Sequence, residues 1–277
     1  MIRYSCHSEN FGILSREATF SLVKQLHFDC IDIASRSFLP QKEIQRDPNR
    51  AAAELRSLSD AYALPVSELF LGSVEIDGKP VSPSHPDADK PSFFYAFSKI
   101  CQFAQKAGFL SIMGDAGVKQ PALSHEQCME RTGRILQKQA LIAAEHGIAF
   151  HVEPSRNSLL HTAEACRTMC RLAPSLRYTL DFLHFQYQGI SQEEAITLLP
   201  LSGHLHARQA KKGYGKCDFS AGEIDYPKIV AAMKKQNWSG DIMLEFWYSP
   251  HLKEEGIDPI EQNIVMRYFL KQWFQTM

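Results

Sequence analysis

The chain has 277 residues, a hydrophobic fraction of 44% and a formal net charge of −1. An α/β barrel of about 250 residues is one domain, so we expect residues 1–277 to fold as a single unit. The near-neutral charge gives no electrostatic footprint for nucleic acid, and no apolar run approaches membrane-spanning length. The first residues lack the apolar core of a signal peptide. We therefore expect no nucleic-acid partner, no membrane partner and no secretion signal.

The cysteines indicate a reducing compartment. There are seven of them, an odd number, and no two have Cys-x-x-Cys spacing. Cys166 and Cys170 lie four residues apart in a helical segment and share one face, which is typical of core packing. Reduced thiols are usual in the cytosol. We expect a cytoplasmic protein, with a homo-oligomer among the assemblies that the sequence leaves open.

Short apolar runs alternate along the chain with amphipathic segments of helical character. Ser15 and Ser124 are capping residues before an acidic first turn, and Gly108 and Gly147 follow helical segments and precede apolar runs. The predicted strands lie near residues 2–6, 29–33, 64–69, 109–113, 148–153, 176–181, 202–206 and 241–246. The predicted helices lie near residues 16–26, 48–62, 92–107, 125–146, 162–172, 192–200, 226–236 and 259–275.

This alternation predicts a parallel sheet covered by helices. Eight strand–helix units in a chain of this length favour a closed (β/α)8 TIM barrel over an open doubly wound sheet. A dinucleotide-binding fold is disfavoured because no Gly-x-Gly-x-x-Gly motif follows the first strand. The predicted fold class is therefore α/β, as a single-domain TIM barrel.

Three long connections follow predicted strands and should lie on one face of the barrel. The first, residues 71–91, is rich in proline, and a loop of this length often forms a lid or binds a ligand. A plain surface insertion is an equal alternative. The others are residues 114–121 and 209–218. His7, at the end of the first strand, and these loops are candidate specificity elements.

Acidic and imidazole side chains occur at the ends of four predicted strands, namely Glu153, Asp181, His206 and Glu245. Parallel strands place these positions at the same edge of the sheet. Three carboxylates gathered there would repel one another unless a positive charge lay between them. A bound divalent metal is the simplest explanation, and this pattern points to an enzyme.

These motifs resemble the xylose isomerase-like TIM-barrel superfamily of sugar isomerases and epimerases. The matching residues are Glu153, Asp181 followed by His184, the His204-Leu-His206 pair, and Glu245. The resemblance implies that Glu153, Asp181, His206 and Glu245 coordinate the metal. It also implies that His184 contacts a substrate hydroxyl, although a hydrogen-bonding role behind the ligands is an alternative.

Other residues near these strand ends have two interpretations each. His151 and His204 precede a ligand by two positions and point the same way, and we expect them to be buried. Arg208 can face the pocket rim and bind substrate oxygen or phosphate, or form a salt bridge with a neighbouring acid. Lys211 and Lys212 could hold a phosphate together with Arg208, although loop lysines are usually solvated.

Three oxygen ligands and one imidazole suit Mn²⁺, Mg²⁺ or Co²⁺, with Zn²⁺ as a further option. Such an ion would polarise a substrate carbonyl and acidify the neighbouring C–H group. Glu153 and Glu245 could then remove and return the proton from opposite faces. The expected reaction is epimerisation or isomerisation of a sugar through a metal-stabilised cis-enediolate, in carbohydrate metabolism.

Three other functions remain in competition. A dehydratase of a keto-polyol would begin with the same proton abstraction and then expel a β-hydroxyl. An endonuclease IV-like hydrolase needs further histidines, which are absent after the third and fourth strands and after Asp218. A non-catalytic binding protein would not need all four ligands. The substrate is also open: a bare sugar, a phosphorylated sugar, an inosose or a small hydroxy-keto acid.

Overall fold

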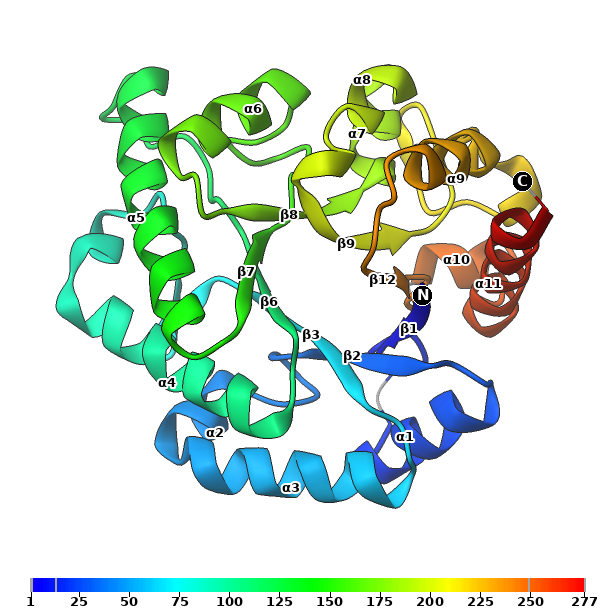
Figure 1. Ribbon diagram of the computed structural model, residues 1–277, viewed down its shortest axis with the longest axis horizontal. Coiled ribbons are helices and arrows are strands. Elements are labelled where there is room, and N and C mark those ends of the chain that lie inside the picture. The colour runs from blue at the N-terminus through cyan, green and yellow to red at the C-terminus, as the bar shows by residue number, and fades with distance from the viewer. Residues whose placement is uncertain (1, 13, 249, 277) are drawn as a thin grey trace.

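The computed structural model describes residues 2–12, 14–248 and 250–276. Its centre is a closed barrel of eight parallel strands in the spatial order β1-β12-β9-β8-β7-β6-β3-β2. The first and last strands lie side by side and close the ring (Figure 1). The predicted TIM barrel is confirmed. The barrel strands are β1 (Arg3–His7), β2 (Cys30–Ala34), β3 (Val66–Gly72), β6 (Ser111–Gly114), β7 (Ala149–Val152), β8 (Arg177–Asp181), β9 (Ser202–Ala207) and β12 (Asp241–Leu244).

Helices surround the barrel and follow its strands in chain order (Figure 1). Ser124 begins α5 with a capping box shared with Gln127, as its sequence predicts. Gly108 ends α4 with a left-handed φ of 94°. The longer helices are α1 (Arg16–Gln25), α3 (Pro48–Ala61), α4 (Pro91–Ala107), α5 (His125–Glu145), α6 (Ala163–Leu172), α9 (Tyr226–Lys235) and α11 (Pro259–Thr276). All of them lie within two residues of the predicted ranges.

Several short elements were not predicted. The helix expected at residues 192–200 is split into α8 (Gln192–Ile196) and the 3-10 helix η2 (Leu199–Leu201). Helices this short bury too few apolar side chains to give a clear periodic signal. The other unpredicted elements are α2 (Gln41–Arg46), α7 (Phe182–Gln188), α10 (Pro250–Glu254), η1 (Pro86–Asp89), η3 (Phe219–Ala221), and the hairpin of β10 (Ala210–Lys211) with β11 (Tyr214–Gly215).

The proline-rich connection of residues 71–91 is more ordered than a plain loop. It contains a hairpin of β4 (Val74–Ile76) and β5 (Lys79–Val81), and β4 packs against α4. Asp77 and Gly78 both have positive φ values, which a two-residue hairpin turn requires. This Asp-Gly signal was present in the sequence. The hairpin and its packing show that much of this connection is part of the folded structure.

The strand register places the predicted ligands beside one another. Asp181 on β8 pairs with His206 on β9, and His206 pairs with Met243 on β12. Glu153 directly follows β7, and Glu245 directly follows β12. All four therefore lie at the carboxyl-terminal edge of the barrel, where TIM-barrel enzymes carry their active sites.

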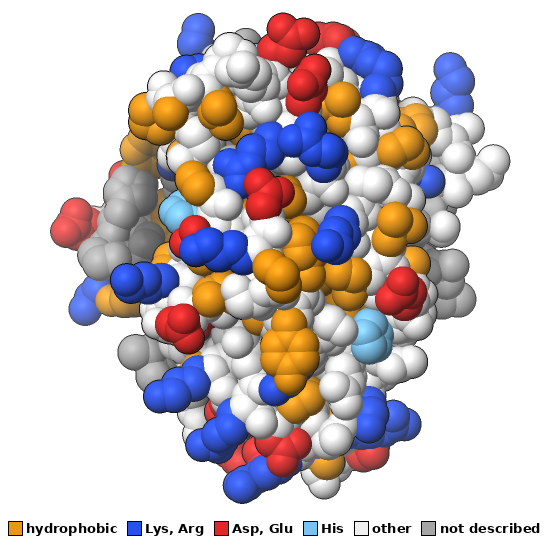
Figure 2. Space-filling view, turned by 90° about the vertical axis from the view of Figure 1, so that its left-hand side faces the viewer, with side chains coloured by type: hydrophobic (Ala, Val, Ile, Leu, Met, Phe, Trp, Pro, Cys, Tyr) orange, Lys and Arg blue, Asp and Glu red, His pale blue; other side chains and the backbone are white. Residues whose placement is uncertain are grey.

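The apolar core fills the space between barrel and helices; Phe93, Phe97 and Phe103 of α4, for example, are fully buried. Among the described residues, no helix is both long and apolar enough to cross a bilayer. On the face that lies at the left of Figure 1, basic, acidic and apolar side chains are interspersed (Figure 2). Neither sign of charge forms a continuous field on that face.

Candidate metal centre and active site

Glu153, Asp181, His206 and Glu245, here called the rim cluster, converge in the structure. One ligand atom from each lies within 4.8 Å of the others. His206 Nδ1 lies 2.8 Å from Glu153 Oε1 and 3.2 Å from Glu245 Oε2. The four predicted ligands are therefore close enough to share one ion.

Arg208 lies inside this cluster and not at the pocket rim. Its Nε and Nη2 bind Asp181 Oδ2 at 2.8 and 2.5 Å, and its Nη1 lies 2.8 Å from Glu245 Oε1. The side chain is buried, so the salt-bridge alternative describes its observed contacts. Three carboxylates and one guanidinium leave a net charge of −2 when His206 is neutral, which one divalent cation balances.

The donor set fits such an ion. It consists of three carboxylates and one imidazole, which suit a hard or borderline divalent cation. Glu245 Oε2 is buried, and its nearest polar neighbour among the described residues is His206 Nδ1 at 3.2 Å, which also contacts Glu153. A buried carboxylate oxygen without a partner of its own is costly, and a cation there would satisfy it.

The electrostatics of the metal-free cluster place a proton on His206. Burial lowers the pKa of this imidazole, but the carboxylates of Glu245 and Glu153 outweigh burial and raise it well above 6.5. Burial raises the pKa of Glu245, whereas Arg208 and His206 lower it to about 2. The Glu245 carboxylate is therefore ionised at neutral pH. A metal that binds His206 Nδ1 must displace the proton.

His184 reaches the cluster because α7 begins directly after β8. Asp181 caps this helix through Oδ1, which accepts a hydrogen bond from Leu183 N at 2.8 Å. The first turn then places His184 Nε2 3.8 Å from Glu153 Oε2 and 4.0 Å from Asp181 Oδ2. His184 Nδ1 is buried and has no hydrogen-bond partner among the described residues, so it is available to a ligand.

An aromatic wall lies next to the rim cluster. Phe70 stacks on His206 with ring centroids 5.7 Å apart, and His7 meets Phe70 edge to face at 5.0 Å. The Trp247 ring lies 6.2 Å from that of His7. Burial lowers the pKa of His7 to about 4, and its Nε2 has no hydrogen-bond partner among the described residues. Phe70 and Trp247 were not predicted, because an aromatic residue at a strand end is usually core.

A second polar group, here called the interior cluster, fills the barrel beneath the rim. It consists of Asp32, Glu68, His151 and His204, all buried. His151 Nδ1 lies 2.6 Å from Glu68 Oε1, and His204 Nε2 lies 2.8 Å from Asp32 Oδ2. The burial predicted for His151 and His204 is confirmed. Asp32 and Glu68 were not predicted. The one sequence feature that could have revealed them is a carboxylate in the middle of an apolar strand.

Ligand atoms of Asp32, Glu68, His204 and His206 also lie within 4.8 Å of one another. Their surroundings differ from those of the rim cluster. Glu68 already accepts hydrogen bonds from Ser111 and Thr179 at 2.7 and 2.8 Å. The interior cluster lies below the strand ends, and its acids already lie beside imidazoles. The rim cluster is therefore the candidate for a bound ion.

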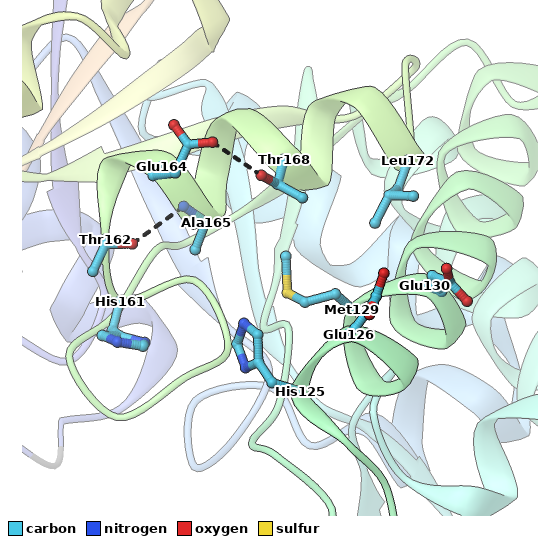
Figure 3. Close-up of a pocket in the computed structure, with 10 residues that line it drawn as sticks. All are labelled: His125, Glu126, Met129, Glu130, His161, Thr162, Glu164, Ala165, Thr168 and Leu172. Atoms are coloured by element: carbon cyan, nitrogen blue, oxygen red, sulfur yellow. Dashed lines mark hydrogen bonds between the residues drawn. The ribbon is translucent and has the colours of Figure 1, made fainter.

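Two other predicted features lie apart from the ligands. Lys211 Nζ lies 5.0 Å from the centroid of the Tyr214 ring, and the Lys212 side chain packs beside Gly189. Neither has a contact with Arg208 among the described residues. A groove of about 470 Å³ lies between α5 and α6 and is lined by His125 and His161 among others, but by none of the rim cluster (Figure 3).

Solved structures of similar architecture include sugar epimerases and a dehydratase. D-allulose 3-epimerase from Methylomonas sp. in complex with D-allulose is 17% identical, with a TM-score of 0.75 over 98% of this chain and 96% of that one. 3-keto-D-glucoside 4-epimerase from E. coli is 15% identical, with a TM-score of 0.73 over 98% of this chain and 100% of that one. The probable 3-DHS dehydratase from Bacillus anthracis is 17% identical, with a TM-score of 0.72 over 96% of this chain and 99% of that one. At these identities the likeness establishes the fold.

No curated protein matches the sequence. A family model described as xylose isomerase-like TIM barrel matches residues 20–267, which is most of the chain and includes all four rim ligands. The resemblance inferred from the strand-end motifs is thereby confirmed. This chain belongs to the xylose isomerase-like TIM-barrel family.

Proposed function

We propose that the protein is a divalent-metal-dependent isomerase or epimerase of a sugar or sugar derivative. The observation that carries this proposal is the rim cluster, three carboxylates and one imidazole at the carboxyl-terminal edge of the barrel. Sugar epimerases among the structures of the same architecture support it. Because one fold hosts many reactions, the reaction is inferred from the residues of the site and not from the fold.

Glu153, Asp181, His206 and Glu245 would hold the ion. When bound, it supplies Lewis-acid polarisation of a substrate carbonyl, which acidifies the adjacent C–H group. Mn²⁺, Mg²⁺ and Co²⁺ fit the donor set best. Metal binding and proton removal are then tasks of the same side chains, because the cluster contains the carboxylates nearest to the expected substrate.

Glu153 and Glu245 would carry the proton. They follow β7 and β12, which lie three strands apart in the ring, so they can flank a substrate across the barrel mouth. One glutamate removes the proton from the carbon next to the carbonyl, and a cis-enediolate of the substrate forms. The other returns a proton to the opposite face, which inverts that carbon, or to the neighbouring carbon, which isomerises the sugar.

Neighbouring side chains would orient the substrate. His184 Nδ1 and His7 Nε2 are buried polar atoms without partners among the described residues, and both suit substrate hydroxyls. Phe70 and Trp247 cover the adjacent wall and limit the access of water. Arg208 would act through Asp181 and Glu245, whose carboxylates it fixes, in addition to the direct substrate contact expected from the sequence.

A dehydratase is the second candidate, because the probable 3-DHS dehydratase has the same architecture. The reaction would begin with the same proton abstraction, and the electron pair would then expel the β-hydroxyl as water. The site holds the groups for the first step in either case. Product analysis separates the two reactions.

An endonuclease IV-like activity gains no support. Asp218, where the sequence lacks the expected histidine partner, caps the turn of η3 by accepting hydrogen bonds from Ser220. It also accepts one from Gln262 Nε2 at 2.8 Å. These contacts indicate a structural role for Asp218 and leave the additional metal ligands of that enzyme without counterparts there.

The test is solvent exchange. The purified chain would be stripped with a chelator, reloaded with Mn²⁺, and incubated with a panel of ketoses in deuterated water. We expect deuterium at the carbon next to the carbonyl, and its loss in the chelated sample. A metal-loaded protein that introduces deuterium into none of the ketoses in the panel would contradict the proposal.

A further inference from the structure

Two cationic side chains near the rim cluster have no acidic partner. They are Lys216, which follows β11, and Arg156, which lies three residues after Glu153. Among the described residues, neither makes a hydrogen bond or an ion pair. Arg208 differs from both, because two carboxylates neutralise it. The charge of Lys216 and Arg156 is therefore available to a ligand.

Lys216 points toward the site. Its Nζ lies 3.8 Å from the centroid of the Trp247 ring, and Trp247 follows Glu245 by two residues. Its backbone has a left-handed φ of 56°, which is unfavourable for a residue with a Cβ and occurs at functional sites. Burial lowers the pKa of Lys216 to about 7, with a further contribution from Arg208. Glu245 and Asp181 act in the opposite direction, so this ammonium group lies within electrostatic range of the ligands.

Arg156 approaches the same loop from the other side. Its guanidinium lies 4.1 Å from the centroid of the Tyr187 ring. A Cβ placed on Gly215, the neighbour of Lys216, would lie 3.7 Å from Arg156 Nη1. The charge of Arg156 also contributes to the lowered pKa of Lys216. Arg156 and Lys216 therefore lie in neighbouring loops, and their like charges repel each other.

The charge balance of the site explains what such an arrangement favours. With a divalent ion, the rim cluster and Arg208 are neutral, and Arg156, together with Lys216 in its protonated form, adds uncompensated positive charge. A neutral sugar that covered them would bury two unpaired cations, at a cost in binding free energy. An acidic group would pair with both, and Arg156 could bind it with two parallel hydrogen bonds.

We propose that Lys216 and Arg156 form a cationic subsite for an acidic group of the substrate, a carboxylate or a phosphate. The inference rests on the proposed function and deepens it: the substrate is an acidic ketose derivative that places its anionic group on the loops after β7 and β9. This assignment differs from the phosphate site expected from Lys211, Lys212 and Arg208. Lys211 and Lys212 pack elsewhere, and Arg208 is already neutralised.

The test compares three ketoses that differ only at carbon 6: D-fructose, D-fructuronate and D-fructose 6-phosphate. Their affinities for the Mn²⁺-loaded protein would be measured by calorimetry. Only an acidic group at carbon 6 can form charge-assisted hydrogen bonds with Lys216 and Arg156. We therefore expect at least one of the two acidic ketoses to bind about tenfold more tightly than D-fructose. Preference for the carboxylate or for the phosphate identifies the acidic group.

Variants locate the preference. Lys216→Met and Arg156→Met should each reduce the preference for the acidic ketose, and neither should weaken the binding of D-fructose, because each removes a cation that a neutral sugar leaves unpaired. Lys216→Arg keeps the charge and should retain the preference, as should Lys212→Met, a control on an exposed lysine of the same loop. Unchanged Mn²⁺ affinity and circular dichroism show that each variant is folded. Equal affinity for all three ketoses, or a preference that survives both Met variants, would overturn the proposal.

The readout is binding, so it is independent of turnover. An acid preference without solvent exchange for any ketose would support the subsite and contradict the proposed reaction. Solvent exchange and binding that favour neutral ketoses alone would leave the proposed reaction intact and contradict the subsite.

Discussion

The barrel holds two clusters of carboxylates and imidazoles that meet at His206. The rim cluster presents Nδ1 of this residue with Glu153 and Glu245, whereas Nε2 faces the interior cluster, 4.0 Å from Glu68 Oε2. In the interior, each acid lies beside an imidazole and accepts hydroxyl hydrogen bonds. At the rim, Arg208 neutralises only part of the charge.

The rim cluster and the interior cluster contain the same residue types, so residue type alone does not define a metal site. Acids that are already paired hold the barrel interior together. Acids that share too few positive charges need a cation from outside.

Glu153→Gln and Glu245→Gln should each lower turnover by about 10²–10⁴-fold, because the amide cannot accept the substrate proton. Part of the metal affinity should remain, since an amide oxygen still coordinates. If each glutamate serves one face, the two variants should differ in which epimer exchanges its proton with solvent. Glu145→Gln, on the exposed end of α5, is the control. Full activity in either variant would contradict the two-base mechanism. So would an equal loss of activity in both variants that is explained by their failure to bind metal.

Asp181→Ala and His206→Ala should chiefly lower metal affinity, because we propose these residues as ligands and assign them no proton-transfer role. Titration of the metal-free variants with Mn²⁺ measures the effect. Asp181 also caps α7 and binds Arg208, so its variant should be less stable as well. A variant with wild-type metal affinity would show that its residue is not a ligand.

Glu68→Gln should lower the free energy of unfolding by about 1–3 kcal/mol, since it leaves buried hydrogen-bonding groups unsatisfied. Its effect on Mn²⁺ affinity should be small beside that of His206→Ala. Urea denaturation and metal titration of the same variant provide both values. Loss of metal binding at unchanged stability would place the ion in the interior cluster.

Metal affinity should rise with pH. The carboxylates of Glu245 and Glu153 outweigh burial and raise the pKa of His206 above 6.5, so its proton must leave when metal binds. Below that raised pKa, affinity should increase by about tenfold per pH unit, and it should level off above it. Calorimetry in buffers of different ionisation enthalpy counts the released protons. If no proton is released when metal binds at pH 7, His206 is not protonated in the metal-free protein.

The sequence predicted the fold and the rim cluster because both depend on local patterns. An apolar run that ends in an acid fixes the strand and its rim position together, as at Glu153 and Glu245. The interior cluster required pairing across the barrel: Glu68 is 83 residues from His151, and no local signal joins them. Lys216 was missed for a similar reason, since only the folded β9 connection brings it to Trp247. Arg208 had two open interpretations, and strand register decided its contacts.

The most direct test of the account is a crystal structure of the Mn²⁺-loaded protein with anomalous diffraction at the manganese edge. We expect one ion, coordinated by Glu153, Asp181, Glu245 and Nδ1 of His206, with His204 and Glu68 uncoordinated. An ion among Asp32, Glu68 and His204, a cluster of three ions, or no anomalous peak at the rim would contradict it.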